Sequence, residues 1–315
     1  MKVVYLDQNK WIELARVQAG ITTSGPLVEL YSRVEAAVKQ ELIVFPLSVS
    51  HVIETSKRND AKSRGCVALV QAKLSRGIAY RSRAGRLHVE VCNVMHRVFK
   101  GLTPNQTQNW FLVNCFFEAF EPFDSMVSQS EDVDAIKRML MRKAAPDLYF
   151  DFMVGQDDSI RRYANSKFNS GISDLISRIE SRRKKLDGLT VDVRRRVYLV
   201  QLFLENQDLF LHIANQLGYS YGDLRRMGDL AVRSLVEDVP TLNVEAEMSA
   251  RLESETVKLK TNDAIDMQSF YTAIPYSSWI FAEKASISRA RQAKLDSKYG
   301  VAMSSSIIDL FKVIP

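Results

Sequence analysis

The chain has 315 residues, of which 46% are hydrophobic and 25% are charged, and its formal net charge is +6. This composition is typical of a soluble globular protein and excludes wholesale disorder. Polar residues interrupt the longest apolar stretches, at 109–120 and 197–213, well short of ~20 positions, so both predict buried helices and no membrane span.

The three cysteines lack CxxC spacing, which argues against a disulfide framework and a thiolate zinc site. A strand-like run begins at Lys2, so no targeting leader is expected before the fold. Together these features predict a cytoplasmic protein.

The first 58 residues predict strand, helix, helix, strand, helix. The run KVVYL at 2–6 suits a buried strand, and apolar residues then recur at helical spacing. A break at 20–26 precedes a second helix at 27–40, a strand within 41–48, and a helix at 48–58. This order predicts a parallel sheet with helical crossovers.

The stretch 59–257 predicts helices almost throughout. Apolar residues recur at i, i+3 and i+4 within 86–99, 108–120, 133–144, 171–186, 193–217 and 222–238. We therefore predict a helical insertion at 59–257 that splits an α/β domain made of 1–58 and 258–315. Within the C-terminal part, helices are expected at 261–274, 286–300 and 306–314, and strands at 278–283 and 301–305.

Basic residues are concentrated where the insertion begins. Residues 56–100 carry eleven Lys or Arg against two acids, a net charge of +9, which leaves −3 for the rest of the chain. Such a field attracts a polyanion, with nucleic acid the first candidate. Solvated helix faces are the alternative interpretation.

Acidic residues stand at or beyond the ends of the predicted strands. Asp7 follows the first strand, Glu54 lies in the helix after the second, and Glu283 ends the strand at 278–283. Asp263 and Asp266, at i and i+3 in the helix before that strand, can share one face. Taken singly, each acid could instead be a helix cap or a surface residue.

A convergence of these acids would require a counter-charge. Two carboxylates ~5 Å apart repel by roughly 3 kcal/mol at an effective dielectric near 20, so the group must take up protons or bind a cation. Oxygen ligands without His or thiolate suit Mg²⁺ or Mn²⁺. Such an ion can activate water at a phosphodiester, so the acids and the basic segment together predict a metal-dependent nuclease.

The motifs VVYLDQN, FPLSVSHVIE and NDAIDMQSFYTAIPYSSWIFAEK resemble the PIN-domain family of metal-dependent nucleases. The resemblance covers 1–58 and roughly 258–315. It implies a Rossmann-like parallel sheet, a cluster of acids that holds Mg²⁺ or Mn²⁺, and hydrolysis of RNA or sometimes DNA.

Carried over by motif, the catalytic and metal-binding acids would be Asp7, Glu54, Asp266 and Glu283, with Asp263 open as an alternative third acid. Asn9 and Ser278 would be supporting polar groups. Three positions depart from the family pattern: Gln8 stands where Thr or Ser is commoner, Glu283 where Asp is commoner, and Ser278 where some relatives have Asp. The basic residues expected to contact nucleic acid are Lys57, Arg58, Lys62, Arg64, Arg81 and Arg83.

The function expected from these features is a Mg²⁺- or Mn²⁺-dependent endoribonuclease, a toxin-like effector in stress or phage defence. The insertion would gate access or bind a regulatory protein partner. Two alternatives remain open: a nuclease acting on single-stranded or flap DNA, and a non-catalytic PIN-like module that binds nucleic acid or protein.

Overall fold

Both ends of the chain contribute strands to one parallel sheet, in the order β2-β1-β5-β6. The structure is a computed structural model and describes residues 1–102, 106–122, 135, 138, 140, 142–226 and 228–314. The strands of this sheet are β1 (Lys2–Leu6), β2 (Ile43–Val44), β5 (Trp279–Phe281) and β6 (Ala302–Ser304). The α/β class and the joining of the two chain ends in one parallel sheet are therefore confirmed.

Each face of the sheet packs against its own apolar core. Val4 and Leu6 of β1 belong to one buried cluster, and Val3 and Tyr5 belong to another, as the alternation of a strand requires. The first core includes residues of α1 (Gln8–Gln18), α2 (Pro26–Lys39) and α4 (Ala61–Ser75). The second includes residues of α14 (Pro240–Ser254), α15 (Thr261–Ala273) and α16 (Lys284–Gln292).

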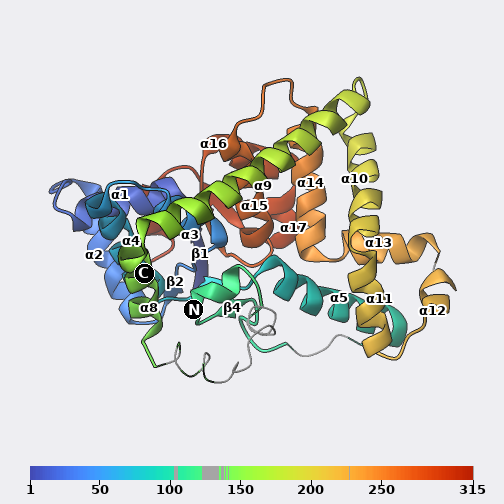
Figure 1. Cartoon of the computed structure of the whole chain (residues 1–315), viewed down its shortest axis with the longest axis horizontal. Helices are drawn as coiled ribbons and strands as arrows, with labels where there is room; N and C mark the ends of the chain where they lie inside the picture. The colour runs from blue at the N-terminus through green and yellow to red at the C-terminus, as the bar shows by residue number, and fades with distance from the viewer. Residues whose placement is uncertain are drawn as a thin grey trace.

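The predicted boundaries of the insertion do not coincide with these cores. Both α4 and α14 lie within the predicted insertion, yet each helps to cover the sheet. A third apolar cluster does belong mainly to the insertion and lies at the right of Figure 1. Its residues come from α5 (Arg83–Lys100), α10 (Val191–Glu205), α11 (Gln207–Gln216), α12 (Tyr221–Arg226), α13 (Asp229–Glu237) and α14.

The longest helix, α9 (Asp158–Lys185), ties the insertion to the sheet domain. It runs diagonally across the upper part of Figure 1 and contacts α3 (Val49–Ser56), α14 and α15. Ile172 of α9 packs in one small cluster with Ala264 and Ile265 of α15. Near the start of α9, the buried Arg161 donates from Nη1 to the carbonyl oxygen of Ser56 at 2.7 Å. One helix of the insertion is thus anchored to both α3 and α15.

The other helices that the structure describes are α8 (Ala145–Gly155), α17 (Leu295–Tyr299) and the 3₁₀ helices η1 (Phe116–Ala119) and η2 (Ile307–Lys312). No helix in the described parts of the chain is both long and apolar enough to cross a membrane.

The prediction of an all-helical insertion is wrong. β3 (Ala79–Tyr80) and β4 (Leu112–Val113) pair antiparallel, and Ala79 also bridges to Leu47. The apolar segment 108–120, predicted as a helix, contains β4 and η1, because a short apolar run suits a strand as well as a buried helix. The helix predicted at 286–300 is broken at Lys294, whose φ is 55°. The helix predicted at 133–144 falls largely outside the described residues.

Candidate metal centre

Two acids lie together at the carboxyl edge of the sheet. Leu6 pairs with Phe281, and the backbone N–H of Asp7 donates to the carbonyl oxygen of Phe281 at 2.8 Å. Asp7 and Glu283 each occupy the residue before a helix, α1 and α16 respectively. Parallel strands thus deliver the first and last predicted acids to one place, the edge where open α/β sheets carry their sites.

Hydrogen bonds orient both of these carboxylates. Oδ1 of Asp7 accepts the backbone N–H of Gln8 at 2.8 Å, so Asp7 also caps α1. Asn9 Nδ2 donates to Oε1 of Glu283 at 2.8 Å. The sequence motif predicts Asn9 as a supporting group, and in the structure its direct contact is with Glu283, the acid from the other end of the chain.

Glu54 and Asp266 complete the group from two packed helices. Glu54 projects from α3 and Asp266 from α15, and each is half-buried. The negative charges of Asp7 and Glu283 act on both of them. Ser286, near the start of α16, donates its hydroxyl to Oδ2 of Asp266 at 3.1 Å.

Asp263 has other partners. Its Oδ2 accepts the backbone N–H of Lys260 at 2.9 Å in a capping interaction at the start of α15, and its Oδ1 lies 3.3 Å from Nη2 of Arg289. A capped and ion-paired carboxylate has little reason to turn toward other acids. The structure thus favours Asp266 over Asp263 as the acid that α15 contributes.

Burial and mutual repulsion raise the pKa of three of these acids. Burial, opposed by the Gln8 hydrogen bond and reinforced by Glu283, raises the pKa of Asp7 to about 6. Burial, followed by the charges of Asp7 and Asp266, raises the pKa of Glu54 to about 8. Burial, followed by Asp7 and Glu283, raises the pKa of Asp266 to about 7. Each carboxylate therefore pays in free energy for being charged without a counter-ion.

The carboxylate oxygens of these four acids are ligands that suit a hard divalent cation, but the four side chains lie too far from one another to share one ion. Within the described residues, no three His, Cys, Asp or Glu side chains are grouped closely enough to hold a metal ion. All four acids offer oxygen ligands, as Mg²⁺ and Mn²⁺ prefer. The raised pKa values of Asp7, Glu54 and Asp266 come first from burial and then from neighbouring negative charges, and a cation would oppose both effects. The residues present fit such an ion by type and charge, and ligation requires the carboxylates to move closer together than they stand.

Lys57 is the predicted basic residue whose charge acts on Glu54. Its charge lowers the pKa of Glu54, and its Nζ lies 5.0 Å from the centre of the Phe168 ring on α9. Arg58 follows in the chain and donates to the hydroxyl of Ser63 at 3.1 Å, and Lys62 is exposed. Lys57 and Arg58 follow directly on the helix that carries Glu54, and Lys62 lies in the first turn of α4.

The expectation that Arg64 contacts nucleic acid is wrong. Its side chain is buried and donates to two carbonyl oxygens, those of Met153 at 3.1 Å and Arg58 at 2.8 Å. It therefore stabilises the connection between α3 and α4 and joins it to α8. Arg81 and Arg83 lie elsewhere, in the wall of a cavity beneath α9, and Arg83 is paired with Glu245 at 2.9 Å.

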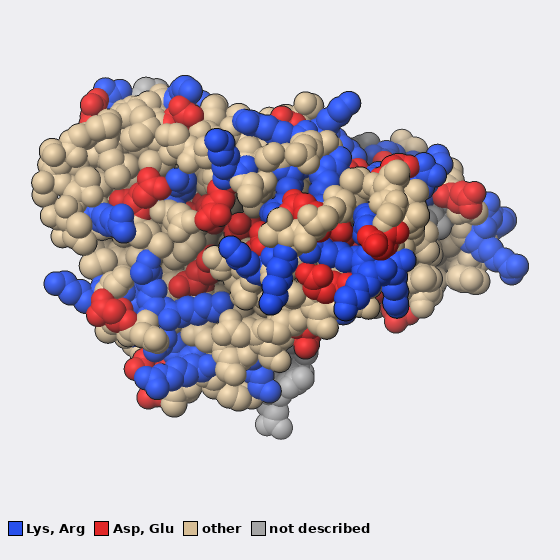
Figure 2. Space-filling view, turned by 90° about the horizontal axis from the view of Figure 1, so that it is seen from above, with Lys and Arg blue, Asp and Glu red and all other residues tan. Residues whose placement is uncertain are grey.

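The basic segment as a whole is partly neutralised by the fold. Four of its cations form ion pairs with acids from other segments: Lys73 with Glu35, Arg76 with Glu41, Arg83 with Glu245 and Arg97 with Asp238. Figure 2, which views the molecule from above, shows acidic side chains gathered in the hollowed middle of that face among many Lys and Arg. Cations surround the acids on this face, and the uniform basic surface suggested by the +9 segment is absent from it.

The expectation that Ser278 supports the acids is also wrong. Its backbone N–H donates to the carbonyl oxygen of Val3 at 2.8 Å, which places it before β5 begins, at the amino edge of the sheet. Its side chain is exposed there. Asp7 and Glu283 follow the carboxyl ends of β1 and β5, at the opposite edge of the sheet.

Gln8, the departure from the family pattern, belongs to a buried polar network. Its Nε2 donates to the hydroxyl of Thr55 at 3.0 Å, and Thr55 in turn donates to Oε1 of Gln71 at 2.9 Å. Tyr149 donates to the same Gln71 oxygen at 2.7 Å. The network joins α1, α3, α4 and α8 directly behind Asp7 and Glu54. The members of this network are too far apart in the chain for the sequence pattern to predict their hydrogen bonds.

His51 lies beneath the acids and is fully buried. Its Nδ1 accepts the backbone N–H of Ser48 at 3.0 Å, so Nε2 carries the proton and donates to the carbonyl oxygen of Leu6 at 2.7 Å. Burial lowers the pKa of His51 to about 3. The histidine is therefore a neutral link between α3 and the end of β1.

Comparison of the chain with known proteins found no relative. No protein-family model, no curated protein and no solved structure matches the chain.

Proposed function

We propose that this chain is a divalent-metal-dependent phosphodiester hydrolase that cleaves RNA. The observation that carries the proposal is that Asp7, Glu54, Asp266 and Glu283, from four separate elements, lie near enough for their charges to act on one another, although they stand farther apart than metal ligands do. Such a group has no evident purpose in stabilising a fold, because it is electrostatically unfavourable until a cation joins it.

The four acids would hold Mg²⁺ or Mn²⁺, which would lower the pKa of a bound water and neutralise charge at the scissile phosphate. The chain's own residues prepare for this role. Asn9 and Ser286 orient the carboxylates of Glu283 and Asp266 through their hydrogen bonds. His51 positions α3 against β1, and the backbone groups of Ser48 and Leu6 occupy both of its ring nitrogens, so we assign it no part in proton transfer.

RNA is the proposed polymer because of the family resemblance and because of the cations beside Glu54. Lys57, Arg58 and Lys62 follow the helix that carries this acid and can attract phosphates on either side of a cleaved bond. DNA shares that backbone chemistry, so the choice between the two polymers belongs to the experiment.

The test is cleavage of matched single-stranded RNA, structured RNA, single-stranded DNA and flap DNA, with Mn²⁺, with Mg²⁺ and with chelator. We expect metal-dependent cleavage of RNA that is lost in Asp7→Asn and Asp266→Asn. The matched control is Asp263→Asn, the same chemical change one turn away on α15, which should retain cleavage. Cleavage that survives in chelator or in Asp266→Asn would contradict the proposal, and an intact polymer in every arm would favour a binding module.

A further inference from the structure

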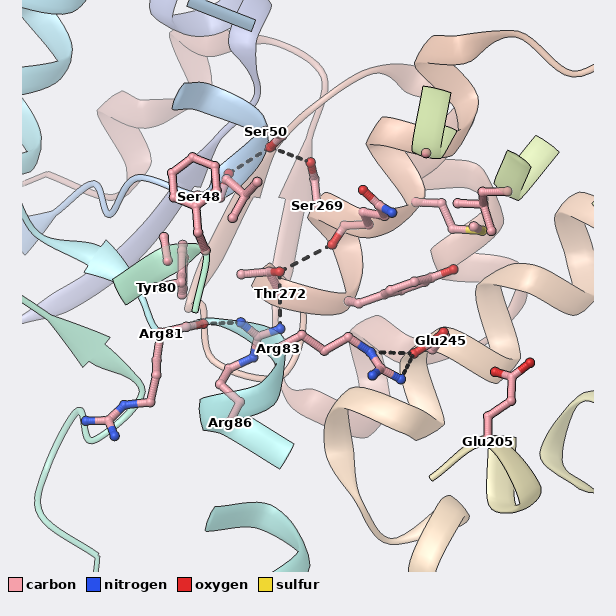
Figure 3. Close-up of a pocket in the computed structure, with 18 of the residues that line it drawn as sticks. Ser48, Ser50, Tyr80, Arg81, Arg83, Arg86, Glu205, Glu245, Ser269 and Thr272 are labelled. Atoms are coloured by element: carbon pink, nitrogen blue, oxygen red, sulfur yellow. Dashed lines mark hydrogen bonds and ion pairs between the residues drawn. The ribbon is translucent and has the colours of Figure 1, made fainter. Parts of the chain in front are cut away.

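A cavity of about 420 Å³ lies beneath α9, between the sheet domain and the insertion. Its volume falls within the range of ~300–1,000 Å³ that small-molecule sites occupy. Residues of α3 and α15 form one side, and residues of α5, α9, α10 and α14 form the others. Figure 3 shows Ser50 and Ser269 on the first side, with Arg83, Arg86 and Glu245 facing them across the space.

The cavity is separate from the candidate metal centre. None of Asp7, Glu54, Asp266 and Glu283 lines it. Tyr5, which is buried, lies between the two, because its hydroxyl is near Ser50 and Ser269 on one side while the charges of Asp7 and Glu54 act on it from the other. A ligand in the cavity would therefore not touch the acids.

The cavity wall contains a buried cation without an ion-pair partner. Arg86 is 2% exposed, and its guanidinium donates to Thr272 Oγ1 at 3.2 Å, to Thr241 Oγ1 at 3.4 Å and to the carbonyl oxygen of Arg81. All three acceptors are neutral, and among the described residues no carboxylate oxygen lies within 4.0 Å of it. The nearest compensating charge is that of the buried Glu90, whose Oε1 accepts the Thr241 hydroxyl. Burial lowers the pKa of Arg86, and Tyr276 and Glu90 offset this only in part, so a further anion beside the guanidinium is favourable.

Other features of the wall add to the positive potential. Arg178 of α9 also lines the cavity, and it forms no ion pair with another residue in the described parts of the chain. The first residues of α3 and α5 line the cavity as well, so the N-termini of two helices, which carry partial positive charge, lie at its wall. The lining includes four arginines and two glutamates, Glu205 and Glu245, and is therefore positive on balance.

The rest of the lining suits an aromatic ligand with hydroxyl or amino groups. Phe120, Tyr198 and Tyr271 supply ring surface. Glu205, Gln268 and the serine hydroxyls supply hydrogen-bond acceptors for sugar hydroxyls or base amino groups. Inorganic phosphate alone would leave this part of the cavity without a partner.

We propose that this cavity binds a mononucleotide, with its phosphate toward Arg86 and Arg178 and its base against the aromatic side chains. The inference stands independently of the proposed hydrolase, because the cavity and the metal centre share no residue. The ligand chemistry has two sources, a free nucleotide or the terminal nucleotide of an RNA strand, and the experiment separates them.

The test is calorimetric titration of the full chain, in chelator, with each of the four nucleoside monophosphates, with inorganic phosphate and with a short 5′-phosphorylated RNA. We expect at least one nucleotide to bind with one-to-one stoichiometry and at least about tenfold more tightly than inorganic phosphate, because base stacking adds affinity. Tighter binding of the RNA than of any monophosphate would identify a strand terminus as the source of that nucleotide. Weaker or equal binding of the RNA would identify the free nucleotide.

Three variants locate the site. Arg178→Ala, which removes an exposed side chain, should weaken binding by about tenfold, as loss of a charged hydrogen bond does. Gly171→Trp places a ring in the cavity wall, where a Cβ meets no atom within 4 Å, and should abolish binding. Gly155→Trp, the same change on α8 where a Cβ is equally free, should bind as the wild type does.

Asp7→Asn distinguishes this inference from the proposed function. Nucleotide binding should be unchanged in Asp7→Asn even where RNA cleavage is lost. The inference is overturned if no nucleotide binds, if inorganic phosphate binds as tightly as the nucleotides, if Gly171→Trp and Arg178→Ala both bind as the wild type does, or if Asp7→Asn abolishes binding.

Discussion

Replacing Glu54 by Gln should stabilise the metal-free protein at alkaline pH. The pKa of Glu54 rises from 4.5 to about 8 on folding, mainly through burial and then through the charges of Asp7 and Asp266. Because the folded state holds the proton more tightly, this carboxyl stabilises the fold fully below about pH 4.5, and that contribution is lost as pH rises toward about 8.

The rise of the Glu54 pKa from 4.5 to about 8 would destabilise the fold by about 5 kcal/mol above about pH 8, at about 1.4 kcal/mol for each unit of pKa. Part of it is shared with the neighbouring acids, whose own protonation relieves the same repulsion. We therefore expect Glu54→Gln to raise the free energy of unfolding by about 2–3 kcal/mol near about pH 8.5 and by about 1 kcal/mol or less near about pH 5.

The assay is urea unfolding of the protein in the presence of chelator at both pH values. The midpoint and the slope of the transition are compared between Glu54→Gln and the wild type. Glu29→Gln is the control, because Glu29 forms an exposed ion pair with Arg33, and such pairs contribute little at either pH. An equal effect of Glu54→Gln at both pH values, or destabilisation at the higher one, would refute the idea that Glu54 is buried among like charges.

Three further results are expected. The ring signals of His51 in NMR spectra should not shift between about pH 5 and about pH 8, because burial lowers its pKa to about 3; a titration near its ordinary value would contradict the buried, neutral assignment. Gln71→Leu should cost about 1–3 kcal/mol in urea unfolding, because it leaves the hydroxyls of Thr55 and Tyr149 without their acceptor, and an unchanged midpoint would show that the network contributes nothing. Arg161→Met should cost a similar amount and also weaken Mn²⁺ binding, because it frees the end of α3 next to Glu54; unchanged affinity would show that α9 does not position this acid.

The sheet and the place of its acids could be predicted because both depend on local pattern. A short apolar run followed at once by an acid and an amphipathic helix identifies β1 with Asp7, and the same reasoning identifies β5 with Glu283. The parallel order of the strands then brings both acids to one edge.

What sequence could not predict depends on partners that are distant in the chain. Arg64 looked like a surface cation, and its burial follows from the carbonyl oxygen of Met153, far along the chain. Asp263 and Asp266 look alike in sequence, and Arg289 is what holds Asp263. The strands β3 and β4 are two residues each and exist through their mutual pairing, so periodicity offers nothing to recognise.

The predicted start of the insertion does not coincide with the edge of an apolar core, for a related reason. The change from mixed to helical pattern after residue 58 predicts a change of domain. α4 nevertheless continues the layer that covers β1, with Val67, Ala68 and Val70 in the same core as Val4 and Leu6. Helical spacing shows which face of a helix is apolar and leaves open which partner covers it.

The most direct test of the metal centre is calorimetric titration of Mn²⁺ into the chelator-free protein near neutral pH. We predict saturable binding by the wild type and by Asp263→Asn, with loss of that binding in Asp7→Asn and Asp266→Asn. Absence of binding to the wild type, or equal binding by all four proteins, would contradict the assignment of these acids to a metal centre.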